Sequence, residues 1–318
     1  MIDTGEVSDL DSYDVTVLMS TYNGEKYIRE QIDSILKQKD VNVHLVIRDD
    51  NSKDRTVEIL HDYQNRFDCI DVLETKENLG ACGSFFYLMS LSFKTEYYAL
   101  ADQDDVWDED KLITAIRMIK DKETKNKSPI LYHSNLRVVD SNNNFLRNCH
   151  SWSRSNQSKY CFITEVLATG CTIVYNKALS NIAIEKKPTE FSMHDAWLFS
   201  VASLFGQVIY DDTPHINYRQ HGNNVDGTRK KQLGLEALGR EYRRIFNWKD
   251  QPRFKNALIL NQEFKSELDV EQKEKLNMML YYKKSISKRI QLLMDKNIYT
   301  SNQYLTLRSK IKIILRNI

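Results

Sequence analysis

The first half of the chain alternates short apolar runs, rich in β-branched residues, with segments whose apolar residues recur at helical spacing. This alternation constrains the fold more than any other feature of the sequence. The apolar runs predicted to be strands lie at 15–19, 43–47, 70–73 and 97–101. Strands separated by helices pair in parallel through right-handed crossovers, with helices on both faces of the sheet. We therefore expect a Rossmann-like α/β domain built on a mostly parallel central sheet.

The remainder of the chain falls into two parts. Between residue 128 and about residue 220 the pattern is mixed. It predicts strands at 130–136, 168–175, 208–210 and 216–218, and helices at 178–184 and 196–205. From Leu233 onward the pattern is almost purely helical, with one break at Gln251-Pro252. The predicted organisation is an α/β domain at 1–232 followed by a helical region at 233–318.

Three of the first four predicted strands end in clusters of polar residues. These clusters are Thr21-Tyr22-Asn23, Asp49-Asp50 and Asp102 to Asp105. In open α/β sheets, ligands bind beyond the carboxyl ends of the strands. Asp, Asn, Ser and Thr are also common in ordinary turns and helix caps, which is the alternative explanation for each cluster. Because three clusters meet at one edge of the sheet, we expect a binding site there.

The third cluster is dominated by carboxylates, with Asp102, Asp104, Asp105 and then Asp108 in close succession. Packed at a strand end, these side chains repel one another unless a cation neutralises them. Mg²⁺ and Mn²⁺ prefer carboxylate oxygens and commonly complete their coordination with substrate phosphates. The sequence contains no GxxxxGK[ST] loop, no GxGxxG after a strand and no HExxH, so P-loop, dinucleotide and zinc-hydrolase sites are disfavoured. The cluster therefore predicts a metal–phosphate site.

An ordered set of motifs across about residues 14 to 228 resembles the family 2 glycosyltransferases with the GT-A fold. The motifs are Met19–Gly24, Arg48–Asp54, Glu77–Gly80, Ala101–Trp107, Met193–Trp197 and Tyr218–Asn224. The versions at 102–107 and 218–224 look most like those of bacterial rhamnosyltransferases that build cell-wall or capsular polysaccharide. The resemblance implies a GT-A catalytic domain that uses a nucleotide-diphosphate sugar.

The resemblance also implies roles for individual residues around the donor. The residues it assigns to the nucleotide-sugar are Thr21, Tyr22, Asn23, Asp49, Asp50, Asp102, Asp104, Arg219 and His221. A carboxylate after the second strand would accept a hydrogen bond from the imide N–H of uracil or thymine, a donor that cytosine lacks. Arg219 and His221 would approach the diphosphate, for which the guanidinium fork is well suited. The metal, Mg²⁺ or Mn²⁺, is assigned to Asp104, Asp105 and His221.

The acceptor side follows from the same resemblance. Asp195 matches the family's catalytic base, which removes the proton from the acceptor hydroxyl during inverting attack. The alternative is a helix-start carboxylate that only interacts with the helix dipole. His194 and Gly170 fall where the acceptor pocket is expected. Trp107 and Trp197 are candidates for stacking on a sugar, although aromatic residues at helix starts more often belong to the core.

The charge of the chain is unevenly distributed. Residues 240–318 contain 18 basic and 8 acidic side chains, whereas the rest of the chain is acidic; within 281–318 there are 9 basic residues and one acidic residue, Asp295. Three explanations remain open: helices packed on the body with a solvated basic face, basic helices on an anionic membrane, or a dimerisation hairpin. Nucleic-acid binding has no supporting motif.

The location is predicted from the N-terminus and the cysteines. The first 25 residues are acidic, whereas a secretory signal starts with basic residues before an apolar stretch. No apolar run approaches the roughly 18 residues of a membrane span. Five Cys without CxxC pairs are typical of free thiols in a reducing compartment. We expect a cytoplasmic protein, peripheral to the inner face of the cell membrane.

These expectations combine into one predicted function. The chain would be an inverting, metal-dependent glycosyltransferase that moves a sugar from a UDP- or dTDP-sugar, with dTDP-L-rhamnose the favoured donor, to a lipid-linked glycan. The first alternative is the same chemistry with a UDP-hexose or UDP-galactose donor. A sugar nucleotidyltransferase would need a Gly-rich basic loop after the first strand, which 20–26 lacks. A non-catalytic glycan-binding module would not need the run of carboxylates.

Overall fold

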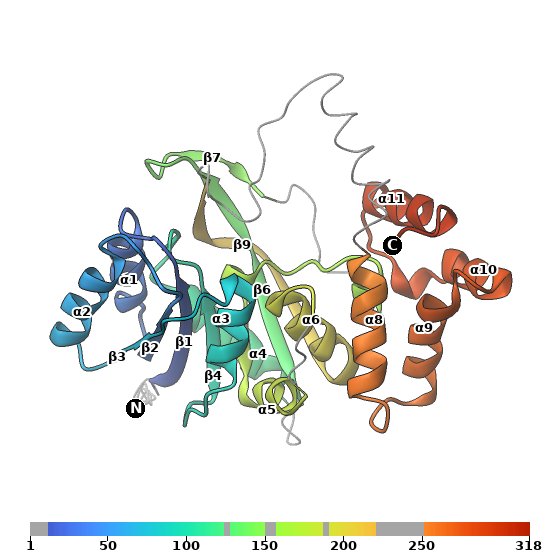
Figure 1. The fold of residues 1–318 in the computed structure, drawn as a ribbon, viewed down its shortest axis with the longest axis horizontal. Helices are drawn as coiled ribbons and strands as arrows, with labels where there is room; N and C mark the ends of the chain where they lie inside the picture. The colour runs from blue at the N-terminus through green and yellow to red at the C-terminus, as the bar shows by residue number, and fades with distance from the viewer. Residues whose placement is uncertain (1–11, 124–127, 150–156, 187–190, 221–250) are drawn as a thin grey trace, which may run out of the picture.

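The computed structural model describes residues 12–123, 128–149, 157–186, 191–220 and 251–318. These residues form one nine-stranded mixed sheet, in the order β3-β2-β1-β4-β8-β6-β9-β5, with β7 paired to β6 (Figure 1). The strands are β1 (Tyr13–Thr21), β2 (Val41–Asp49), β3 (Ile70–Glu74), β4 (Tyr97–Ala101), β5 (Val106–Trp107), β6 (Ile130–Val139), β7 (Phe145–Asn148), β8 (Val174–Asn176) and β9 (Gln207–Arg219).

The first four strands pair in parallel, as the strand–helix alternation predicts. They are connected and covered by α1 (Ile28–Leu36), α2 (Thr56–Arg66), α3 (Gly80–Met89) and, after β5, α4 (Lys111–Lys122). Alternate residues of a strand point to opposite faces, so β1 contributes to two cores. Val17 packs in the core formed with α1, α2 and α4, whereas Leu18 packs in the core formed with α3. The sheet is therefore buried on both faces.

The second half of the sheet is mixed and departs from the predicted elements in two places. The predicted strand at 168–175 is wrong for most of its length: only β8 is a strand, and a 3-10 turn, η2 (Gly170–Thr172), precedes it. The predicted strands at 208–210 and 216–218 are parts of one strand, β9. The predicted helices correspond to α5 (Lys177–Glu185) and α6 (His194–Phe205).

The C-terminal helices are built into the same hydrophobic core as the sheet. They are α8 (Pro252–Glu263), α9 (Val270–Tyr281), α10 (Ile286–Met294) and α11 (Gln303–Ile314), with η1 (Cys161–Ile163) and η3 (Lys296–Ile298) between body and tail. Phe264 stacks on Trp197 of α6 at 5.6 Å between ring centroids. The Gln272 amide donates to the carbonyl of Leu204 at 2.7 Å. Packing of the tail on the body, one of the three explanations left open, is therefore present.

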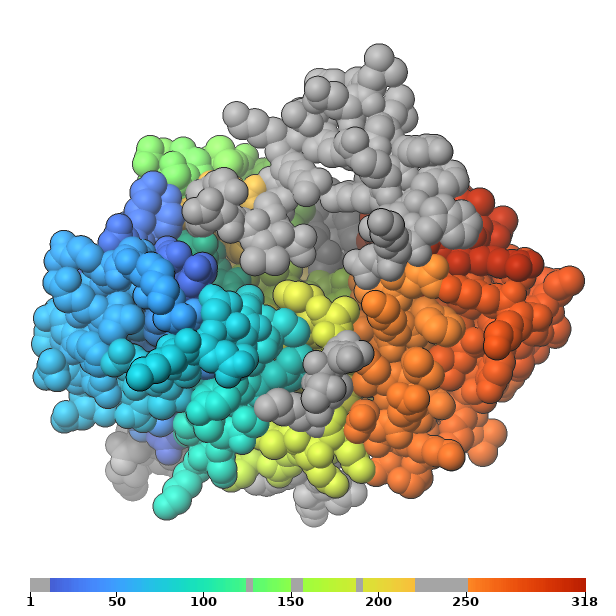
Figure 2. Space-filling model, in the orientation of Figure 1, coloured from blue at the N-terminus to red at the C-terminus, as the bar shows by residue number. Residues whose placement is uncertain are grey.

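Figure 1 places α9, α10 and α11 at the end of the molecule opposite α1 and α2, and Figure 2 shows the C-terminal helices as a continuous body beside the rest. Within the residues that the structure describes, no helix is both long and apolar enough to cross a membrane. The predicted domain boundary near residue 232 lies outside the described residues, so it stays a prediction.

Candidate active site

The register of the parallel strands brings the three polar clusters to one edge of the sheet. Thr21 pairs with Asp49 at the ends of β1 and β2, and Met19 pairs with Ala101 at the end of β4. The chain segments that follow these ends, including Asp102, therefore leave the sheet side by side. This arrangement confirms that the polar clusters share one edge.

Two carboxylates and a thiol meet just beyond β4. Ligand atoms of Asp102, Asp105 and Cys171 lie within 4.8 Å of one another. Burial, followed by the charges of Asp104 and Asp195, raises the pKa of Asp102 to about 7. Burial and the charges of Asp104 and Asp102 raise the pKa of Asp105 well above its usual range. The cluster is therefore a place where negative charge is costly unless it is neutralised.

The Asp105 side chain also shows where a cation would fit. Its Oδ1 accepts a hydrogen bond from the backbone N–H of Arg219 at 3.1 Å. Its Oδ2 is buried and accepts no hydrogen bond from any described residue. Buried polar atoms are usually paired, and a carboxylate oxygen is a good ligand for Mg²⁺ or Mn²⁺. The donor set around Asp105 thus fits a hard divalent ion.

A buried lysine, which the sequence analysis did not single out, lies beside this cluster. Lys111, the first residue of α4, is fully buried, and its Nζ lies 3.6 Å from the centroid of the Trp107 ring without a hydrogen-bond acceptor among the described residues. Burial lowers the pKa of Lys111 to about 7, although the charges of Cys171 and Asp105 oppose this. The only sequence signal was its position six residues after Asp105.

Arg219, which was predicted to contact the diphosphate, is bonded inside the protein in this structure. It is buried, with its Nε–H donating to the carbonyl of Asp104 at 2.9 Å and its Nη1 to the carbonyl of Ser141 at 3.0 Å. Its Nη2 pairs with Glu30 of α1, and the guanidinium lies over the Tyr27 ring. In this structure Arg219 holds the Asp104-Asp105 segment in place, and its contact with the diphosphate stays a prediction.

Asp50 is likewise engaged inside the protein. Its carboxylate is buried and accepts hydrogen bonds from the backbone N–H groups of Leu79 and Gly80, both at 2.8 Å, at the start of α3. It also forms an ion pair with Arg48. Burial opposes the charged form, but the bonds from Arg48 and Leu79 outweigh it and lower the pKa of Asp50. In this structure Asp50 therefore binds Arg48 and the start of α3, and its contact with the nucleotide stays a prediction.

The residues at the ends of β1 and β2 are bonded to one another. The Thr21 hydroxyl donates to Asp49 at 3.1 Å, and the Ser52 N–H and hydroxyl donate to the same carboxylate at 2.8 and 2.6 Å. The Asn23 side chain accepts from the Lys53 N–H at 2.8 Å. Thr21 and Asp49 are buried in this network. They therefore shape the edge, and a base contact by Asp49 stays a prediction.

Tyr22 and Gln103 connect the first and third clusters. The Gln103 amide accepts from the Tyr22 N–H at 2.8 Å and donates to the Tyr22 carbonyl at 3.0 Å. A Cβ on Gly24 would approach Gln103 Oε1 to 2.3 Å, so a larger residue there would require the Gln103 side chain to shift away from Tyr22. The Tyr22 ring is 47% exposed at the edge. Among the described residues assigned to the nucleotide, Tyr22 and Asn23 are therefore the exposed ones.

Asp195 lies in the first turn of α6 and faces the carboxylate cluster closely enough for its charge to raise the pKa of Asp102. Its neighbour His194 is buried, stacks on Phe85 at 4.0 Å and has no hydrogen-bond partner for either ring nitrogen among the described residues. Burial lowers the pKa of His194 to about 3. A Cβ on Gly170 would lie 3.0 Å from His194 Nε2 and 3.8 Å from Asp195 Cβ. The structure thus brings together the residues predicted for the acceptor side.

The two tryptophans suggested for sugar stacking are core residues instead. Trp197 is fully buried between Phe191 and Phe264, and its indole N–H donates to the carbonyl of Ala183 at 3.1 Å. Trp107 is buried under Lys111. Neither ring presents a face to a ligand, so both suggestions are corrected. His221 lies outside the described residues.

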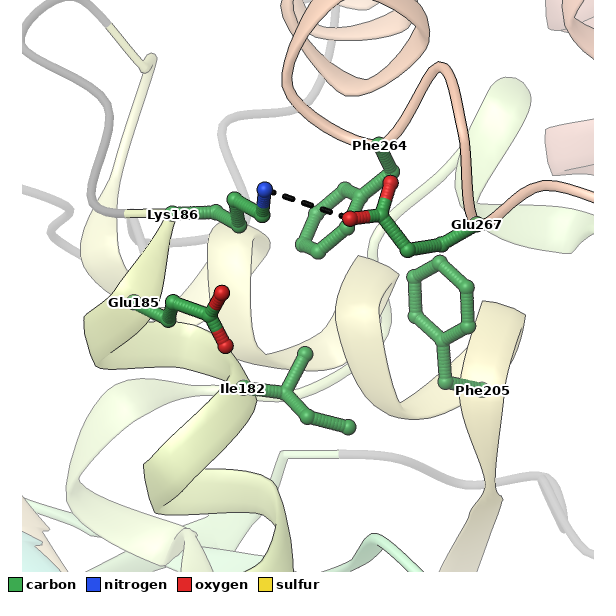
Figure 3. Close-up of a pocket in the computed structure, with 6 residues that line it drawn as sticks. All are labelled: Ile182, Glu185, Lys186, Phe205, Phe264 and Glu267. Atoms are coloured by element: carbon green, nitrogen blue, oxygen red, sulfur yellow. Dashed lines mark ion pairs between the residues drawn. The ribbon is translucent and has the colours of Figure 1, made fainter.

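Two pockets lined by described residues lie away from the carboxylate cluster. One of about 90 Å³, between α5, α6 and the chain after α8, is lined by Ile182, Phe205 and Phe264 and closed by a Lys186–Glu267 ion pair (Figure 3). A second, of about 270 Å³, lies between His133, Phe199 and Tyr210. The site at the sheet edge is therefore defined by its charged groups and strand register.

Comparisons with known proteins agree with this geometry. The family model described as Glycosyl transferase family 2 matches residues 16–182. The dTDP-rhamnosyl transferase RfbG of Shigella flexneri is 31% identical over 238 residues, covering 68% of this chain and 78% of that protein. The glucosyltransferase WfgD of Escherichia coli is 31% identical over 134 residues, covering 42% of this chain and 49% of that protein.

The fold also has solved counterparts. The crystal structure of S. aureus TarS 1-349 in complex with UDP has a TM-score of 0.53 to this chain at 17% identity, covering 95% of this chain and 88% of that one. A likeness at that identity concerns the fold alone, and it confirms the predicted GT-A type of sheet with helices on both faces and a helical C-terminus. Taken with the family match, it shows that the chain is a glycosyltransferase and belongs to glycosyl transferase family 2.

Proposed function

We propose that the chain is an inverting, metal-dependent transferase that moves L-rhamnose from dTDP-L-rhamnose to a hydroxyl of a lipid-linked glycan during bacterial surface polysaccharide synthesis. The donor is supported by RfbG, whose name gives a dTDP-rhamnosyl transferase. The acceptor class is supported by WfgD, whose name gives a glycan on diphosphoundecaprenol. TuaG of Bacillus subtilis, named for teichuronic acid biosynthesis, is 34% identical over 98 residues.

The observation that carries the proposal is the carboxylate cluster at the end of β4, with Asp195 opposite it. Asp102 and Asp105 are forced together in a buried environment, and the Oδ2 of Asp105 has no described partner. Such an arrangement is electrostatically unfavourable by itself. A divalent cation with a diphosphate removes the strain, which is the purpose we assign to the cluster.

The metal would be held by Asp105 together with Asp104, as the motif implies, and His221 is a further candidate. When bound, Mg²⁺ or Mn²⁺ would neutralise the charge of the departing nucleotide diphosphate. Arg219 keeps Asp104 and Asp105 in position through its bonds to the Asp104 carbonyl and the Asp105 carboxylate. The protein would thus assist the departure of the nucleoside diphosphate by holding the metal-binding carboxylates in a fixed position.

Asp195 would accept the proton of the acceptor hydroxyl while the oxygen attacks the anomeric carbon from the face opposite the diphosphate. Its place in the first turn of α6 and its coupling to Asp102 support this role. His194, buried and neutral, would position the acceptor side of the site together with Gly170. Since the base and the metal residues come from different elements, binding and transfer can be separated by mutation.

A UDP-hexose donor is the second candidate. WfgD carries UDP-Glc in its name, and TarS was solved with UDP and with UDP-GlcNAc. Asp49 fits both donors, because uracil and thymine share the imide N–H. We further propose that the protein acts as a peripheral protein at the cytoplasmic face of the membrane, where a lipid-linked acceptor would be available.

The first test measures nucleotide binding. The protein is titrated calorimetrically with dTDP, UDP and CDP, with and without Mn²⁺ or Mg²⁺, and its melting is followed with dTDP-L-rhamnose and UDP-glucose. A ligand at 100 times its dissociation constant adds roughly 2.7 kcal/mol of stability, so the true donor will stand out. We expect metal-dependent binding of dTDP or UDP but not of CDP. Asp105→Asn should abolish the metal-dependent part and keep the fold, whereas the exposed control Glu58→Gln should change nothing. Unchanged affinity in Asp105→Asn would refute the metal assignment.

The second test separates binding from transfer. Asp195→Asn should bind the donor normally but transfer the sugar roughly 10²- to 10⁴-fold more slowly, the usual contribution of a positioned base. Transfer is measured by release of the nucleoside diphosphate in the presence of a glycan acceptor, with Glu58→Gln again as the control. Near-normal turnover in Asp195→Asn would show that another group takes the proton.

A further inference from the structure

Helix α10 presents an exposed apolar stripe, formed by Ile286, Ile290 and Met294. These side chains are 71%, 55% and 75% exposed. Their spacing of four residues places them on one side of the helix. The opposite side is anchored by Leu292, which is fully buried in the core. Scattered apolar residues on a surface are ordinary, but a stripe along a whole helix indicates a binding surface.

Three lysines flank the stripe. Lys284 precedes α10, Lys288 lies within it and Lys296 follows it. The acidic residue of this region, Asp295, is mostly buried and is already paired with Lys275 at 2.6 Å. An amphipathic helix with an apolar stripe and flanking lysines is typical of helices that lie in the interface of an anionic membrane.

The arrangement disfavours a second copy of the chain on this surface. In a two-fold dimer the same patch meets itself. The lysines that flank the stripe would then be brought close to their copies, which is unfavourable because like charges repel. The acidic body offers no attraction to anionic lipid elsewhere, since residues 1–239 contain 27 basic and 36 acidic side chains. Charge complementarity therefore selects an anionic lipid surface as the occupant.

We infer that α10 is the membrane-contacting element of this enzyme, with the α10 stripe inserted into the headgroup region of an anionic bilayer and Lys284, Lys288 and Lys296 contacting lipid phosphates. This inference deepens the proposed function, on whose lipid-linked acceptor it rests. It names one helix face where the sequence alone pointed to the whole basic tail. α11 lies beside α10 and adds exposed Leu307 and Ile314, so the surface has room to extend.

The inference is tested with the full-length protein and vesicles of phosphatidylcholine, alone or with phosphatidylglycerol. Replacing all three stripe residues with Ser (Ile286→Ser, Ile290→Ser, Met294→Ser) should lower co-sedimentation with the anionic vesicles at least tenfold. A matched control, Phe145→Ser with Leu146→Ser, removes exposed apolar side chains from β7, far from α10 in Figure 1, and should bind like the parent protein.

A charge variant tests the electrostatic half. Changing Lys284, Lys288 and Lys296 to Gln should weaken binding by about fivefold per lysine near the surface. It should also flatten the salt dependence, because exposed charges are screened beyond about 8 Å at physiological ionic strength. Binding of the parent protein should be strong only with phosphatidylglycerol present.

Three results would overturn the inference. The stripe variant could pellet like the parent protein, pelleting could be equal on neutral vesicles, or light scattering could show that the stripe variant converts a dimer into a monomer without vesicle binding by either form. Nucleotide binding is measured in parallel on every variant. Vesicle binding without any metal-dependent binding of dTDP or UDP would refute the proposed function and leave the membrane surface intact.

Discussion

Asp102, Asp105 and Lys111 show how much the sheet edge depends on single charges. Each is buried or held close to a like charge, and each has a pKa moved toward its neutral form, with burial as the largest cause. Lys111 and Arg219 are the buried basic residues beside Asp105, and Lys111 also lies close enough to Cys171 for the charges to interact. Without ligands, two features of this edge are therefore unfavourable: the repulsion between the carboxylates, and the burial of the Lys111 ammonium group without a hydrogen-bond acceptor among the described residues.

This unfavourable arrangement predicts a pH dependence. Asp102 titrates near 3.8 when unfolded and near 7 when folded. Between these values the folded state binds more protons, so Asp102 stabilises the fold at low pH and that stabilisation is lost as the pH rises toward 7. Asp102→Asn should therefore be more stable than the parent protein at pH 7.5, by up to a few kcal/mol at about 1.4 kcal/mol per pKa unit.

Urea unfolding in EDTA, at pH 4.5 and pH 7.5, measures this difference. The advantage of Asp102→Asn should shrink at the lower pH, and Glu58→Gln should show no such advantage. A constant difference between the two pH values would mean that the carboxyl of Asp102 is ionised in the folded protein at both.

At the scale of helices and strands, the prediction succeeded for the elements whose apolar pattern follows from their burial in the core. β1, β2 and β4 lie where the apolar runs place them, because strands inside a sheet that is covered on both faces are mainly apolar. The edge strand β3 was also predicted, although Asp71 and Glu74 in it are exposed. The prediction failed at 168–175, where apolar and polar residues suit either a strand or a turn. There η2 bends under the carboxylate cluster, and Cys171 becomes part of the site.

The candidate site divides in the same way. Motif order predicted which residues gather at the edge, and strand register brings them there. Motif order could not predict that Asp50 forms an ion pair with Arg48 and accepts hydrogen bonds from the start of α3, or that Arg219 forms an ion pair with Glu30. The bonds from Leu79 to Asp50 and from Arg219 to Glu30 join residues 29 and 189 positions apart. A polar residue also looks the same in a sequence whether its partner is a substrate or a helix end.

For the whole molecule, the main finding is that the basic tail belongs to the folded body. Phe264, Leu276 and Met279 lie in the same core as Trp197, and Asn256 exchanges hydrogen bonds with Ser192. The inner and outer sides of the C-terminal helices therefore have different roles. The inner side completes the core, and the outer side is available for the membrane surface proposed above.

Removal of residues 251–318 should therefore damage the fold and not only its location. The truncated protein would expose Trp197 and its neighbours, and we expect insoluble protein or the loss of a cooperative thermal transition. The matched control is the full-length stripe variant, which alters the outer side of α10 and should melt like the parent protein. A soluble truncated form that unfolds cooperatively and still binds nucleotide would contradict this expectation.

The bonds made by Arg219 also determine when the enzyme can become active during its own synthesis. Glu30 and Asp105 are made early, but the residue that links them follows 189 and 114 positions later. Contacts of such large sequence separation form late, because the intervening chain must first be ordered. A nascent chain that already contains β1 to β4 and the aspartates at 102, 104 and 105 still lacks Arg219, whose bonds set Asp104 and Asp105 in place. Donor binding should therefore begin only after β9 has joined the sheet. Until then, the growing chain would not bind nucleotide-sugar at an incomplete site.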